Sequence, residues 1–185
     1  MAQLLCLEQQ GFIKLYFADE SGFNLTPCVP YGWQEIGEYI RMVPSKTQAI
    51  NVFGLLTRDN EFEVYTTEQS VNSDLAIAFI DDFAKHLTQP TVIVLDNAPI
   101  HHSRAFEEKI VEWEQQDLYI FFLPRYSPHL NLIETLWRKI KYEWLKPHHY
   151  INQETLTTAL NDILTKIGDE FMINFKEQKV SIILN

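Results

Sequence analysis

The sequence is poor in cysteine and has no long apolar run. Only two cysteines, Cys6 and Cys28, occur in 185 residues, and without a CxxC spacing they indicate neither a disulfide framework nor a thiolate metal site. No apolar stretch approaches the roughly 20 residues of a membrane span, and the first ten residues lack the basic flank of a secretion signal. These absences favour a soluble, unexported protein of a reducing cytoplasm.

Basic residues are also scarce, since 15 Lys and Arg stand against 25 Asp and Glu and the net charge is -10. DNA binding depends on Lys and Arg replacing the counterions of phosphates, so this balance predicts weak DNA affinity unless another domain contributes. Residues 124–150, however, carry a local net charge of +3, which leaves -13 for the remainder. This segment is either a nucleic-acid contact or an ordinary solvated helix face.

The composition itself, with 46% apolar and 13% aromatic residues, excludes a disordered or fibrous chain. It fits one buried core, and no internal repeat, low-complexity segment or linker divides the chain. We therefore expect a single domain that spans residues 1–185.

Hydrophobic periodicity predicts the order β-β-β-α-β-α-β-α-α. Strands are expected at 11–18, 48–56, 61–65, 91–95 and 118–123, and helices at 73–87, 103–116, from after Pro128 to about 145, and at 153–167. The second and third strands form a hairpin across residues 58–60, and Ser73 is a candidate N-cap. An irregular loop is expected around Pro27, Pro30, Gly32 and Gly37. The order implies an α/β fold, a mixed sheet with helices on both faces.

Two aspartates are predicted to end strands of this sheet. Asp96 follows 91–95, a branched run typical of a strand buried on both faces, and Asp19 opens a turn-forming cluster, 19–22. If the two strands are neighbours, both carboxylates lie at one rim and repel unless a cation sits between them. The ordinary alternative for Asp96 is a turn made with Asn97 and Pro99.

Glu134 is separated from Asp96 by one predicted helix, one predicted strand and a turn. Its helix carries an apolar stripe at Ile133, Trp137, Ile140 and Trp144, beside which Glu134 is expected at a buried border. The ordinary alternatives are a capping arrangement with Asn131 or a helix pair with Arg138. With both aspartates, Glu134 completes an oxygen ligand set for two Mg²⁺ or Mn²⁺ ions. One ion activates the attacking water or 3′-hydroxyl, and the other stabilises the leaving oxygen of a phosphodiester.

Three segments around these acids resemble the catalytic domain of bacterial insertion-sequence transposases related to the mariner superfamily, whose acidic triad is called DDE. They are FADESG at 17–22, VLDNAPIHHS at 94–103 and LPRYSPHLNLIE at 123–134. The resemblance implies a ribonuclease H-like fold and Asp19, Asp96 and Glu134 as catalytic metal ligands. It also implies Mg²⁺ as cofactor, with Mn²⁺ as substitute, and DNA strand cleavage and transfer at the ends of a mobile element.

Such transposases also carry N-terminal helix-turn-helix modules, for which no room exists before Asp19. The resemblance therefore implies a catalytic part that is either separately encoded or truncated. A separately encoded DNA-recognition subunit is one candidate partner, and the family's assembly implies a homodimer in a synaptic complex on element ends and target DNA. The expected location is the bacterial cytoplasm, at the nucleoid.

Further residues are candidates for substrate contact. These are Asn97, His101, Asn131, Arg138 and Lys141. For the two asparagines, turns and caps are the ordinary explanation. Zinc is not expected at His101 and His102, because adjacent helical histidines point apart and no HExxH spacing accompanies them. Trp113, Trp137 and Trp144 are predicted to belong to the core rather than to stack on bases.

Three other functions compete with this interpretation. A glycosidase could use two of the acids but leaves the basic segment unexplained. A related nuclease of the same fold, acting on RNA hybrids or branched DNA, differs only in substrate. A non-catalytic transposon remnant would serve as a binding subunit, and the intact acids argue against it.

Overall fold

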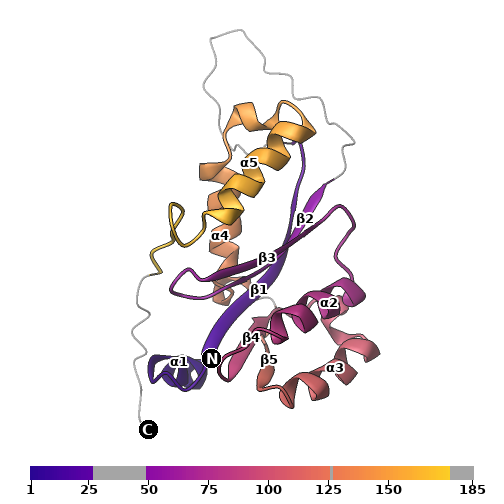
Figure 1. The fold of residues 1–185 in the computed structure, drawn as a ribbon, viewed down its shortest axis with the longest axis vertical. Helices are drawn as coiled ribbons and strands as arrows, with labels where there is room; N and C mark the ends of the chain where they lie inside the picture. Colours follow the sequence, from indigo (N-terminus) through magenta and orange to yellow (C-terminus); the bar gives the residue numbers. More distant parts are fainter. Residues whose placement is uncertain (27–48, 126, 176–185) are drawn as a thin grey trace.

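A five-stranded mixed sheet forms the centre of the molecule in the computed structural model, which describes residues 1–26, 49–125 and 127–175 (Figure 1). The strand order is β3-β2-β1-β4-β5. The strands are β1 (Lys14–Phe23), β2 (Ile50–Leu56), β3 (Phe62–Thr67), β4 (Thr91–Leu95) and β5 (Leu118–Phe122). The first three pair antiparallel, whereas β4 runs parallel to both β1 and β5. The predicted α/β fold with a mixed sheet is confirmed.

Helices cover both faces of this sheet. They are α1 (Ala2–Gln9), α2 (Ser73–Ala84), α3 (Arg104–Glu114), α4 (Ile133–Lys139) and α5 (Gln153–Thr165). Short 3-10 turns occupy Pro99–His102, Pro128–Leu130 and Pro147–Tyr150, and α4 continues into a π-helical turn at Ile140–Trp144. Helix α1 lies where the sequence predicted no element. Within the described residues, no helix combines the length and apolar character needed to cross a membrane.

The alternation of side chains along β1 divides the interior into two cores. Leu15 and Phe17 belong to the core beneath α1, α4 and α5, while Tyr16 and Ala18 belong to the core beneath α2 and α3. Successive strand residues point to opposite faces, so β1 contributes to both. Burial of Trp113 and Trp137 confirms their assignment to the core.

Two local predictions were wrong. The cluster 19–22 is not a turn, because β1 continues to Phe23 and pairs with β2 over its whole second half. Ser73 is not the N-cap of α2; the side chain of Asn72 accepts a hydrogen bond from the Leu75 N–H instead. The hairpin between β2 and β3 is confirmed, with Asn60 at φ 64°. The predicted loop with Pro27, Pro30, Gly32 and Gly37, like Gln48, lies outside the described residues.

Candidate active site

Asp19 and Asp96 lie near each other, just beyond the last paired residues of β1 and β4. Strands β1 and β4 are parallel neighbours, with Phe17 paired to Val94, so each aspartate follows two residues after a paired position. β4 ends at Leu95, whereas β1 continues alongside β2. The predicted neighbourhood of the two strands is therefore found, although Asp19 lies within its strand and not at its end.

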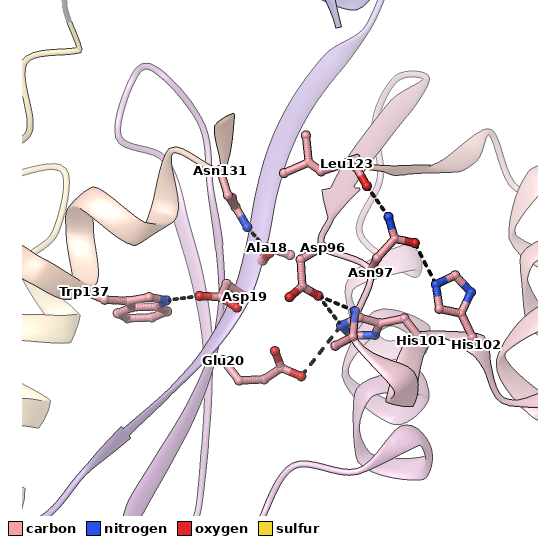
Figure 2. A network of polar contacts seen from close by, with 11 residues as sticks. Ala18, Asp19, Glu20, Asp96, Asn97, His101, His102, Leu123, Asn131 and Trp137 are labelled. Atoms are coloured by element: carbon pink, nitrogen blue, oxygen red, sulfur yellow. Dashed lines mark hydrogen bonds and ion pairs between the residues drawn. The ribbon is translucent and has the colours of Figure 1, made fainter. Parts of the chain in front are cut away.

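The side chain of Asp19 is oriented by α4. The indole Nε1 of Trp137 donates a hydrogen bond to Asp19 Oδ2 at 3.1 Å (Figure 2). Trp137 can approach because the β2 residue paired with Asp19 is Gly54. A Cβ atom on Gly54 would lie 2.8 Å from Trp137 Cη2 and 2.9 Å from Phe62 Cε2. The missing side chain of Gly54 thus makes room for the indole that holds Asp19.

Gly54→Ala is therefore expected to lower the free energy of unfolding by about 1–3 kcal/mol, because the added methyl group overpacks the site. We also expect weaker Mn²⁺ binding, since the displaced Trp137 no longer orients Asp19. Calorimetry and Mn²⁺ titration measure the two effects. Gly22→Ala is the matched control in the neighbouring strand, because its Cβ would meet only the Asn51 side chain, at 3.2 Å. Equal behaviour of the two variants would contradict the assigned role of Gly54.

Asp96 begins a tight turn that is fixed to the neighbouring strand. Its Oδ1 accepts a hydrogen bond from the Ala98 N–H at 2.9 Å. The Asn97 amide donates to the Leu123 carbonyl, and its Oδ1 lies 2.9 Å from His102 Nε2. The turn that the sequence analysis gave as the ordinary alternative is present, and it holds the Asp96 carboxylate at the C-terminal end of β4.

Glu134 lies in the first turn of α4, and the start of that helix is fastened to β1. The buried Asn131 donates from Nδ2 to the Ala18 carbonyl at 3.0 Å, so its side chain does not cap α4. Ile133 and Trp137 are buried as the stripe predicted. Glu134 itself is exposed rather than at a buried border, because its side of the helix faces an open hollow.

The three carboxylates line one hollow of about 500 Å³. Asn97 and Asn131 line it too, together with Arg125 from the segment after β5. A second hollow, of about 680 Å³, shares Asp19, Asn131 and Glu134 with the first and extends between β1 and α4. The candidate contacts Arg138 and Lys141 line this second hollow. His101, in contrast, is fully buried and lines neither.

The site concentrates negative charge. Burial penalises the charged form of Asp19 and raises the pKa of its carboxyl to about 8. The charges of Glu134, Glu20 and Asp96 act in the same direction. Within residues 1–26, 49–125 and 127–175, no Lys or Arg forms an ion pair with any member of the triad. A hard divalent cation fits this set of oxygen donors as the missing counter-charge.

The carboxylates surround the hollow without forming a finished ligand shell. Among the described residues, no three His, Cys, Asp or Glu side chains are already placed to hold a metal ion.

Sequence reasoning missed three residues of this site. Trp137 was assigned to the core alone, although its indole N–H also reaches Asp19. Glu20 received no role, yet burial raises the pKa of its carboxyl to about 7. Gly54 carried no local signal, since its role follows only from its pairing with Asp19. For Glu20, the available signal was the adjacent acidic pair that it forms with Asp19 directly after a predicted strand.

Known structures share this fold. A Mos1 strand transfer complex matches with a TM-score of 0.59 and 13% identity over 90% of this chain and 53% of that chain. A Mos1 mariner paired end complex with Mn gives 0.61 and 13%, over 89% and 52%. The HTLV-2 integrase catalytic core domain in complex with magnesium gives 0.55 and 15%, over 86% and 89%. The chain thus spans about half of the Mos1 chains and has the ribonuclease H-like fold of transposase and integrase catalytic cores.

The sequence comparison is more specific than the fold. Residues 14–157 match the family described as DDE superfamily endonuclease, and the chain belongs to this family. Enzymes of the superfamily generally cleave DNA by phosphoryl transfer with divalent metals. No curated protein matches the chain by sequence.

Proposed function

We propose that this chain is the catalytic domain of a transposase that cleaves and joins DNA strands at the ends of a mobile element. One observation carries the proposal: Asp19, Asp96 and Glu134, from β1, the end of β4 and α4, line a single hollow, and no Lys or Arg of the described residues forms an ion pair with them. Membership of the DDE endonuclease family supports the same chemistry.

Asp19, Asp96 and Glu134 are the residues that would hold Mg²⁺ or, as a substitute, Mn²⁺. Such ions supply charge neutralisation at the scissile phosphate and lower the pKa of the attacking hydroxyl. Trp137 donates a hydrogen bond to Oδ2 of Asp19 and so orients a carboxylate that lines the hollow. The turn after β4 holds Asp96, and Asn131 fixes the start of α4 relative to β1. The chain's own contribution is thus to position three acids from separate elements.

DNA would approach along the second hollow. Arg138 is exposed on α4, and Lys141 follows it with its Nζ 5.1 Å from the centre of the Phe23 ring. Exposed Tyr142 lines the same hollow and offers a ring on which a base can stack. Asn97 and Asn131 line the first hollow, beside the place where a phosphate held by the bound cations would lie.

The assembly belongs to the same proposal. We infer that the chain is a single catalytic domain that works as a homodimer on paired DNA ends, with DNA recognition supplied by a further domain or subunit. Support comes from the net charge of -10, which weakens DNA binding by the chain alone, and from a Mos1 transposase paired-end complex with a left transposon end among the similar structures.

Nicking of supercoiled plasmid tests the proposed activity. We expect the purified chain to nick plasmid at low salt with Mn²⁺ and, more slowly, with Mg²⁺, and to be inactive with EDTA. Low salt is chosen because phosphate contacts weaken steeply as salt rises. Agarose gels measure the nicked product. Nicking that persists in EDTA would contradict the proposed metal-dependent chemistry. If the chain binds Mn²⁺ but nicks no plasmid, the expectation that it is active without its DNA-recognition partner is wrong.

A further inference from the structure

His101 is a buried histidine between two acids of the site. It lies in the 3-10 turn Pro99–His102, five residues after Asp96, and its side chain has 0% exposure. Its Nε2 is 3.6 Å from Asp96 Oδ1 and 3.7 Å from Glu20 Oε1, as Figure 2 shows. One ring nitrogen therefore faces a triad carboxylate and a second acid that the triad does not include.

These polar atoms are left without hydrogen bonds. Among the residues that the structure describes, neither Nδ1 nor Nε2 of His101 has a hydrogen-bond partner, and the buried Oε1 of Glu20 is equally unpaired. Each buried polar atom without a partner lowers stability, and most such atoms in folded proteins are paired. Packing alone does not explain a histidine here. Its ring lies 5.3 Å from that of Phe106, a contact that a phenylalanine at position 101 would also make.

A neutral imidazole carries one N–H, and two carboxylates facing Nε2 favour the tautomer with the proton on that nitrogen. A shift of less than 1 Å brings Nε2 from 3.6 Å to hydrogen-bonding distance of Asp96 Oδ1. Such a bond would engage one oxygen of Asp96 and leave the other for a cation.

We propose that His101 is a positioning residue, whose Nε2–H donates to Asp96 when a divalent cation is bound, and that Glu20 fixes the tautomer of the ring. The inference rests on the proposed metal site. Hydrogen bonds to a ligating carboxylate orient it, and losing such a partner typically weakens metal affinity about 10- to 100-fold.

Two substitutions at this position separate positioning from packing. His101→Phe keeps an aromatic ring against Phe106 and removes the donor, whereas His101→Gln keeps an N–H near the place of Nε2. Both replacements are uncharged, so neither adds a charge to the site. His101→Leu serves as a second apolar variant should the phenylalanine not fit.

Mn²⁺ titration followed by electron paramagnetic resonance, with thermal unfolding in EDTA, measures the outcome. We expect His101→Phe to raise the Mn²⁺ dissociation constant by about 10-fold or more and His101→Gln to stay closer to the parent. The unfolding temperature of His101→Phe should equal or exceed that of the parent, because two unpaired nitrogens are removed. A lower unfolding temperature with unchanged Mn²⁺ affinity would overturn the inference. A parent chain that binds no Mn²⁺ would instead overturn the proposed function.

Discussion

Asp96→Asn is expected to reduce Mn²⁺-dependent nicking by about 1,000-fold, which corresponds to roughly 4 kcal/mol of lost transition-state stabilisation. The substitution removes one negative charge from the metal-binding set. It leaves the local fold in place, because the asparagine Oδ1 can still accept the hydrogen bond from Ala98 that Asp96 accepts at 2.9 Å. The lost activity would therefore report on the chemistry of the carboxylate rather than on unfolding.

Initial nicking rates, measured beside the circular dichroism and unfolding temperature of each variant, provide the comparison. Asp169→Asn is the matched control, since Asp169 is exposed, follows α5 and lines neither hollow. The control should nick at the rate of the parent. If Asp96→Asn retains more than about a tenth of the parental rate, which is less than 1.4 kcal/mol of effect, Asp96 is not a required metal ligand.

Asp19→Asn is expected to stabilise the metal-free protein at alkaline pH while abolishing its response to metal. The pKa of Asp19 is raised from 3.8 in its ordinary state to about 8 in the folded protein. A raised carboxyl pKa means that the contribution to stability is complete below the unfolded pKa and is lost as the pH rises through about 8. Asparagine cannot ionise, and it can still accept the Trp137 hydrogen bond.

Thermal unfolding in EDTA at pH 6 and pH 9 measures this difference. The variant should unfold above the parent at both pH values, and the gap should widen by on the order of 5 °C between pH 6 and pH 9, because Asp19 of the folded parent ionises only around pH 8. Millimolar Mn²⁺ should raise the unfolding temperature of the parent and leave Asp19→Asn nearly unchanged, because only a protein that binds the ion is stabilised by it. Asp169→Asn should follow the parent throughout. An equal gap between Asp19→Asn and the parent at both pH values would contradict the raised pKa.

Local signals located most of the elements, and their failures have a common cause. The run of branched residues in β4 and the apolar stripe of α4 are both buried, and both were found from the sequence because each is a pattern within one element. The cluster 19–22 has the composition of a turn, but pairing with β2 overrides that preference. Helix α1 has no amphipathic pattern in its eight residues, and its only buried residue is Leu5.

The candidate site shows the same division. Asp19, Asp96 and Glu134 were identified from three short motifs, and the structure brings all three to one hollow. The surroundings of the other candidate residues could not be predicted, because a short motif does not show whether each of its side chains is exposed or buried. The side-chain amide of Asn131 donates a hydrogen bond to the carbonyl of Ala18. His101 is buried and lines neither hollow.

The sequence by itself determined the order of the elements that follow α1 and the family, and it singled out the three acids, because these depend on residue type and spacing along the chain. Only the tertiary structure decided that Trp137 holds Asp19, that Gly54 makes room for that indole, and that Glu20 and Asp96 face one histidine. The physical reason is that these contacts join residues from different strands and helices. Their energies depend on burial and distance, which no local pattern encodes.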